Sequence, residues 1–199
     1  MRRAARGILA LSVVAAAIVG GATAGDAAVS CAARSSRATF AAWGDTNQYF
    51  RAPGGGFEPS LTNNWTMTGG AIALVGNEPW HVVGALDLMA AFIPTGGTTT
   101  SPTFCVAAQE DSIRFFVKRP GVRGALLHVA VRVTAGVNVA TMDVDIDGSA
   151  SGWGPSDRYM LPDIRDAAGR QNVTITFSTR GTAAAWLVDD VMVDPWRTL

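Results

Sequence analysis

The feature that most constrains the fold is a series of short apolar stretches separated by turn signals rich in glycine, proline and asparagine. In one of them, Val173, Ile175 and Phe177 alternate with threonine and serine, which is the period of two that defines a β-strand. Beyond the first 28 residues, no window of about 11 or more residues carries the 3.6-residue apolar period of a helix. Turn signals spaced roughly 8 to 12 residues apart predict an antiparallel all-β sandwich.

The expected strands lie in residues 71–75, 86–93, 103–107, 112–118, 125–133, 137–146, 172–179 and 183–193. Neither an internal repeat nor a long linker divides them, so one domain is expected over residues 29–199.

The first 28 residues have the pattern of a signal peptide. Three arginines precede an apolar run from Ile8 to Gly20, and the small residues Ala22 and Ala24 follow it. We expect cleavage near residues 24–28 and a secreted, extracellular protein. The apolar run is shorter than the roughly 20 residues of a membrane span; a retained membrane anchor is the alternative.

Cys31 and Cys105 are the two cysteines of the chain. In an oxidising compartment they are expected to form a disulfide. The alternative is a free thiol acting as a nucleophile.

The charge of the chain excludes a nucleic-acid-binding class. The full chain has 16 basic and 16 acidic residues; residues 1–28 contain three arginines and one aspartate, so 13 basic and 15 acidic residues remain after cleavage. This balance leaves no basic patch for nucleic acid. Arginine replaces lysine everywhere except Lys118, which is typical of a GC-rich bacterial genome.

Asp143, Asp145, Asp147 and Gly148 match the first half of an EF-hand loop. An EF-hand also needs a bidentate glutamate at position 12, and here that position is Gly154. The aspartates alternate with apolar residues, so the segment is expected to be a strand. Its carboxylates form either a solvated face that discourages aggregation or a surface cation site.

Three ordered segments carry a resemblance to a known family. They are residues 52–71 with Gly-Phe-Glu followed by tryptophan, residues 127–162 with two strands followed by tryptophan, and residues 172–195 with an aromatic-x-Val-Asp-Asp-Val strand. Together they resemble the jelly-roll β-sandwiches of carbohydrate-binding modules and galactose-binding-like domains. The whole chain is also similar to uncharacterised secreted proteins of actinobacteria. The resemblance implies a jelly-roll topology for the predicted sandwich.

The resemblance also implies a structural calcium ion that joins Glu58 to Asp189 or Asp190. Calcium takes 6 to 8 oxygen ligands. In the alternative, Glu58 caps a turn and one aspartate pairs with an arginine. Asp87 departs from the family pattern, because a serine is expected at its position.

Sugar binding in such folds depends on exposed aromatic rings. Trp65 and Trp186 lie within the segments that carry the resemblance and are expected to be core residues. The remaining candidates lie beside glycine, proline, aspartate or asparagine, where rings can be exposed. Trp80 is the first choice for a ligand contact and Trp153 the second; the other two candidates are Trp43 and Tyr159. For each of them, packing inside the protein is the alternative.

No catalytic motif is present. Neither a Gly-x-Ser-x-Gly elbow nor a His-Glu-x-x-His helix occurs, and His128 falls inside an apolar strand. A dispersed carboxylate pair for glycoside hydrolysis is the remaining enzymatic alternative. We therefore expect a secreted non-catalytic domain that binds carbohydrate, such as a polysaccharide, or another extracellular ligand. The alternative is a structural or protein-interaction domain of the cell envelope without a sugar site.

Overall fold

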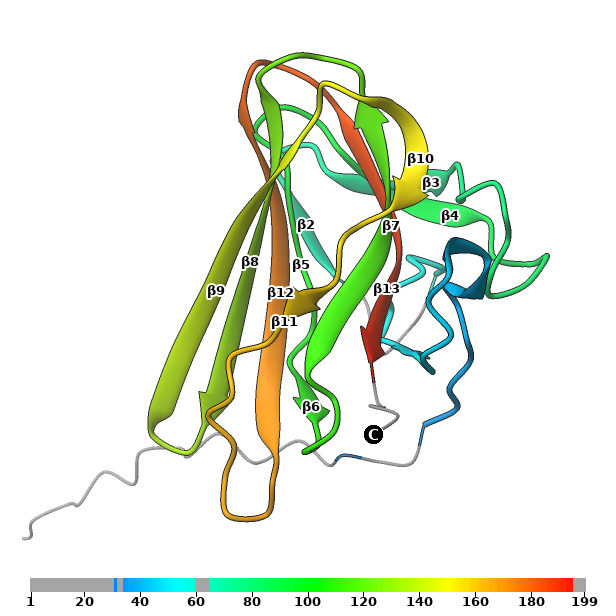
Figure 1. Ribbon diagram of the computed structural model, residues 1–199. Helices are drawn as coiled ribbons and strands as arrows, with labels where there is room; N and C mark the ends of the chain where they lie inside the picture. The colour runs from blue at the N-terminus through cyan, green and yellow to red at the C-terminus, as the bar shows by residue number, and fades with distance from the viewer. Residues whose placement is uncertain (1–30, 32–33, 60–64, 195–199) are drawn as a thin grey trace, which may run out of the picture.

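The computed structural model describes Cys31 and residues 34–59 and 65–194, and this part of the chain forms two antiparallel β-sheets packed face to face (Figure 1). Its one helical segment is the short 3-10 turn η1 (Ala41–Trp43). None of the helical structure in these residues has the length and hydropathy needed to cross a bilayer. The predicted signal peptide, residues 1–28, lies outside the described residues.

The first sheet has seven strands. Its central order is β10 (Ser151–Pro155), β7 (Ser112–Pro120), β13 (Trp186–Asp194), β4 (Met89–Ile93) and β3 (Ile72–Val75), while β1 (Phe50–Arg51) pairs with β13 and β11 (Tyr159–Met160) pairs with β7.

The second sheet has six strands. Its order is β2 (Thr66–Thr68), β5 (Thr98–Thr100), β12 (Gln171–Gly181), β8 (Ala125–Ala135) and β9 (Asn138–Asp147), and β6 (Phe104–Val106) pairs with β12.

The chain passes repeatedly from one sheet to the other. β4, β7, β10 and β13 belong to the seven-stranded sheet, whereas β5, β8, β9 and β12 belong to the six-stranded sheet. Every strand pair in both sheets is antiparallel. The predicted antiparallel jelly-roll β-sandwich is therefore confirmed for the described residues.

The core lies between the sheets and follows the predicted alternation. Val129 and Val131 of β8 and Ile175 and Phe177 of β12 are fully buried, whereas the threonines between them in β12 are partly exposed. Trp186 from the facing sheet is also buried, and so is Trp65. Both tryptophans were expected to be core residues, and the structure confirms this.

The predicted disulfide is present. Cys31 and Cys105 are bonded, with their Cα atoms 5.1 Å apart and a sequence separation of 74. Cys105 lies in β6, so the bond ties the segment before β1 to the six-stranded sheet. Closing a loop of this length stabilises the fold by about 4 kcal/mol in the chain-entropy model.

The aspartate strand is β9, and its carboxylates face a histidine. His128 of β8 lies 2.8 Å from Asp145 (Nδ1 to Oδ1) and 3.1 Å from Asp143 (Nε2 to Oδ1). Arg180 approaches Asp145 at 4.0 Å. The segment that matches the first half of an EF-hand loop is thus a strand, as predicted. The partners of its carboxylates include His128 and Arg180.

Candidate functional site

A loop between β3 and β4, residues 76–88, lies on the outer face of the seven-stranded sheet, away from the six-stranded sheet (Figure 1). Glu78 holds this loop from inside. Its side chain is fully buried, and its carboxylate accepts hydrogen bonds from the backbone N–H of Trp80 (2.5 Å) and of Val82 (2.7 Å). Each carboxylate oxygen therefore fixes one amide of the segment that carries Trp80.

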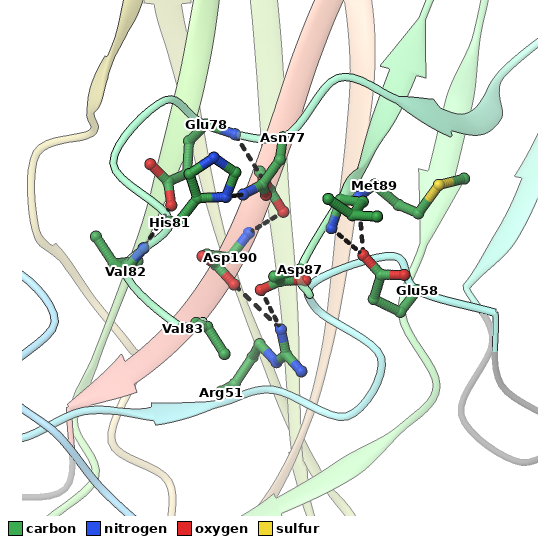
Figure 2. Close-up of polar contacts among 12 residues, drawn as sticks. Arg51, Glu58, Asn77, Glu78, His81, Val82, Val83, Asp87, Met89 and Asp190 are labelled. Carbon is green, nitrogen blue, oxygen red and sulfur yellow. Dashed lines mark hydrogen bonds and ion pairs between the residues drawn. The ribbon is translucent and has the colours of Figure 1, made fainter. Parts of the chain in front are cut away.

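Two further contacts tighten the same loop (Figure 2). The backbone N–H of Glu78 donates to Asp189 Oδ2 at 3.1 Å, which ties the loop to β13. His81 has a left-handed backbone (φ 48°) and its Nδ1 lies 3.1 Å from Asn77 Nδ2. Together these contacts set the direction in which the Trp80 ring leaves the loop.

The Trp80 ring belongs to an aromatic cluster on this outer face. Its centroid lies 4.8 Å from that of Trp43, in an edge-to-face arrangement, and 5.6 Å from that of Phe116. The Trp43 ring also contacts Phe116, at 5.2 Å. Trp153 packs against the same group. Edge-to-face aromatic pairs are favourable by about 0.5–1.5 kcal/mol beyond their buried area, so the cluster holds its rings in a defined arrangement.

Buried side chains support the cluster from below. Phe40 stacks on Phe116 at 5.1 Å, and Tyr49 packs edge-on against Phe40 at 4.9 Å. Burial raises the pKa of the Tyr49 hydroxyl, which donates a 2.7 Å hydrogen bond to Asp45. Arg114 forms an ion pair with the same carboxylate at 2.8 Å. The hydroxyl, carboxylate and guanidinium groups beneath the cluster therefore pair with one another. The outer rings of the cluster remain available to a ligand.

Three of the four predicted ligand residues therefore come together. Trp43 lies in η1, Trp80 in the loop and Trp153 in strand β10; Trp80 is the most open of them, with 44% of its surface exposed. Tyr159 lies in β11 of the same sheet, opposite Ile113, and stacks on Phe115 on the inner face of that sheet. Burial raises the pKa of its hydroxyl to about 12. Although glycine, proline or aspartate lies near each of them in sequence, Trp153 and Tyr159 both lie in strands.

A row of side chains crosses the outer face next to this cluster. Strand register aligns Trp153 with Lys118, Lys118 with Leu187, and Leu187 with Phe92. Residues that are opposite one another in a sheet point to the same face. A hollow of about 290 Å³ opens along this row, lined by Phe92, Lys118, Arg119, Pro120, Ser151, Gly152, Ala185, Trp186 and Leu187.

Beneath the loop, β13 is interrupted by a bulge between Asp189 and Met192. Asp190 has a left-handed backbone there (φ 43°). Gly55 makes the bulge possible, because a Cβ on it would lie 2.9 Å from the Val191 carbonyl oxygen. The bulge turns two successive aspartates toward buried partners, and such bulges commonly re-aim side chains next to functional sites.

The two aspartates are fully buried and their charges are suppressed. Burial, and then the charge of Asp190, raise the pKa of Asp189 well above the usual carboxyl range. Burial, and then the charge of Asp87, raise the pKa of Asp190 in the same way. The amide N–H of Asp190 and that of Glu78 donate to Asp189.

Arg51 balances the remaining negative charge (Figure 2). Its Nη1 lies 2.7 Å from Asp87 Oδ2 and 3.3 Å from Asp190 Oδ1. Burial raises the pKa of Asp87 as well, although the positive charge of Arg51 acts to lower it. Gly56 leaves room for the guanidinium, because a Cβ there would lie 2.2 Å from Arg51 Nη1.

The residues expected to hold calcium do not fit a calcium site. Glu58 accepts hydrogen bonds from the backbone N–H of Leu88 and of Met89, the latter at 2.8 Å. Asp189 faces backbone amides, and Asp190 faces Arg51. Among the described residues, no group of three or more His, Cys, Asp or Glu side chains is placed to hold a metal ion. The observed partners match the alternative reading, in which Glu58 caps a turn and an aspartate pairs with an arginine.

Sequence reasoning did not identify three important residues. Phe116 reads as one of several apolar residues in its strand, yet it is the centre of the aromatic cluster. Arg51 and Asp87 form their ion pair across 36 residues of sequence. The departure at Asp87 from the family pattern was the one available signal, because a carboxylate in place of serine needs a cationic partner when it is buried.

Comparisons with known proteins give no family assignment. No family model matches the chain, and no curated protein matches it. Solved structures with some similarity include TmCBM61 in complex with β-1,4-galactotriose, at 15% identity and a TM-score of 0.45, covering 72% of this chain and 96% of that one.

Two modules from Clostridium thermocellum are also similar. The family 11 carbohydrate-binding module, in complex with a β-1,3-1,4-mixed-linked tetrasaccharide, has 12% identity, a TM-score of 0.40 and coverage of 69% and 91% of the two chains. The C-terminal family 22 module of Xyn10B has 10% identity, a TM-score of 0.42 and coverage of 75% and 95%.

All three TM-scores lie below 0.5, so these structures do not define the class of this protein. Its class follows from the strand pairing and side chains of the chain itself. The described residues define an antiparallel β-sandwich domain with a tryptophan cluster on the outer face of its seven-stranded sheet.

Proposed function

We propose that this protein is a secreted, non-catalytic domain that binds carbohydrate on the outer face of the seven-stranded sheet. The observation that carries the proposal is the convergence of Trp43, Trp80 and Trp153 around Phe116, with Trp80 substantially exposed. Aromatic faces bind the C–H faces of sugar rings, and an exposed tryptophan on a rigid support loses little entropy on binding.

The rigidity of the support favours binding over simple packing. Glu78 fixes the backbone on both sides of His81, and Phe116 lies in the long strand β7. A buried carboxylate is an expensive way to order a surface loop, and its cost is understandable if the loop must present Trp80 in one orientation. Preorganised groups of this kind raise affinity because less order has to be gained on binding.

The test is a glycan array followed by calorimetry with the purified protein. Trp80→Ala is expected to weaken binding to a captured glycan by about 30-fold, equivalent to about 2 kcal/mol for an interface hot spot. Val137→Ala is the control, because Val137 is 97% exposed on the turn between β8 and β9, in the other sheet. No binding to any polysaccharide, or binding that Trp80→Ala leaves unchanged, would remove the proposal.

A second candidate, a protein-interaction domain of the cell envelope, is favoured by a different observation. Apolar side chains are exposed along the edge strand β3 and in the following loop: Ile72 (53%), Val75 (77%), Leu86 (89%) and Leu88 (47%). Exposed apolar surface beside a sheet edge is a common docking surface for protein. Capture of an envelope protein that Val75→Asp abolishes and Trp80→Ala does not would support this candidate over carbohydrate binding.

A further inference from the structure

The hollow beside Trp153 differs in charge from the rest of the molecule. Its lining contains two cations, Lys118 and Arg119, and no carboxylate. The chain as a whole has equal numbers of basic and acidic residues. Among the described residues, most other arginines with side-chain partners face a carboxylate, such as Arg51, Arg114 and Arg165.

Lys118 has no such partner. It is the single lysine of the chain and it is exposed on the outer face. No ion pair joins Lys118 or Arg119 to a carboxylate in the part of the chain that the structure describes. An uncompensated cation at a concave site attracts an anion, because a hollow with low-dielectric walls focuses its field.

The remaining lining fits the body of a sugar ring. Phe92, Leu187 and Pro120 provide an apolar floor, and Ser151 provides a hydroxyl at the rim. Trp153 stands directly opposite Lys118 across the strand pair, so the hollow continues the aromatic site. An apolar floor with a few convergent polar groups is the usual composition of a small-ligand site.

We propose that this hollow binds an acidic sugar unit, with its carboxylate at Lys118 and its ring over Phe92 and Leu187. The inference rests on the proposed function and deepens it, since it names uronic-acid-containing polysaccharides as the ligand class. Charge-assisted hydrogen bonds from ammonium and guanidinium groups are stronger than neutral ones, so the charge of the sugar sets the preference.

The experiment compares two ligands with one backbone, in which the carboxyl groups are either charged or neutralised as methyl esters. Polygalacturonate and its fully methyl-esterified form share one backbone, and affinity electrophoresis or calorimetry compares them on the purified full chain. We expect polygalacturonate to bind at least tenfold more tightly than the ester, and the preference to shrink as salt is raised from 20 to about 300 mM, where the Debye length falls below about 8 Å.

The variant Lys118→Met removes the charge while keeping an apolar stem. It is expected to lower affinity for polygalacturonate about tenfold and to leave binding of the ester unchanged. Arg132→Met is the matched control, because Arg132 is an exposed cation on the outer face of the other sheet; it should change neither affinity.

The outcomes separate the two proposals. If a neutral glycan binds in a Trp80-dependent way but polygalacturonate shows no preference over its ester, or Lys118→Met keeps that preference, the acidic-sugar inference fails and the carbohydrate site stands. If neither the array nor the polygalacturonate pair shows binding, the proposed function fails with it.

Discussion

Replacing Glu78 by glutamine tests whether this buried carboxylate holds the Trp80 loop. The carboxylate accepts N–H groups from both Trp80 and Val82 in a fully buried position. The amide of glutamine has one oxygen, so one of these N–H groups would face an NH2 group instead.

The magnitude follows from those two bonds. Loss of one hydrogen bond to a charged acceptor costs about 1.5–3 kcal/mol, and a buried N–H without a partner costs about 1–3 kcal/mol. We expect Glu78→Gln to lower the free energy of unfolding by about 2–4 kcal/mol. If the loop opens locally before the fold is lost, the loss is smaller and the amide protons of Trp80 and Val82 exchange faster instead.

The assay is urea unfolding followed by tryptophan fluorescence, together with hydrogen exchange at Trp80 and Val82. Asp166→Asn is the matched control, because Asp166 Oδ1 also accepts two backbone N–H groups, from Ala168 (2.8 Å) and Arg170 (2.9 Å), but in an exposed turn. Water can replace those bonds, so the control should change stability much less. A Glu78→Gln protein with unchanged stability and unchanged exchange at both amides would refute the account of the loop.

The remaining predictions concern the carboxylates, the disulfide and export. The melting temperature should be equal in saturating EDTA and in millimolar calcium, because Arg51 already pairs with one oxygen of Asp87 and one of Asp190; a rise in calcium would restore the calcium site that the family resemblance implies. Stability should fall as pH rises from about 5 to 9, because the folded protein retains protons on Asp189 and Asp190, whose pKa values are raised, while the unfolded chain releases them above about pH 4. Asp190→Asn mimics the protonated form and should flatten that slope in urea midpoints measured at pH 5, 7 and 9; an equally steep slope would contradict the assignment. Cys105→Ser should lower stability by about 4 kcal/mol in urea unfolding, and an unchanged midpoint would contradict the stabilising role of the bond to Cys31. Mass spectrometry of the exported protein should show a new N-terminus near residues 24–28, whereas an intact N-terminus would favour a retained anchor.

The sequence was sufficient for the sheets because their signal is local. The alternation of Val173, Ile175 and Phe177 requires only that one face of β12 be buried, and the structure buries it. The pairing of Cys31 with Cys105 could be predicted because the chain has two cysteines. Asp143 and Asp145 were recognised as strand residues from the same period of two, and the sheet then supplied His128 as their partner.

The site was harder to predict because it depends on which distant segments meet. Trp80 and Trp153 were chosen from their neighbours in sequence, but their relation to Phe116 depends on where the loop and β10 lie on the sheet. Tyr159 has a similar sequence context but lies on the inner face of the seven-stranded sheet, because strand register places it opposite Ile113. The partners of Asp189 and Asp190 depend on the bulge in β13, which no local sequence pattern predicts.

The central claim, that sugar binds on the outer face of the seven-stranded sheet, is tested most directly by the indole N–H signals of the tryptophans in a ¹⁵N-labelled sample. Titration with the tightest glycan from the array should shift the signals of Trp43, Trp80 and Trp153 and leave that of buried Trp65 in place. A glycan that binds while the three cluster signals stay fixed, or the failure of every glycan to bind, would contradict the account.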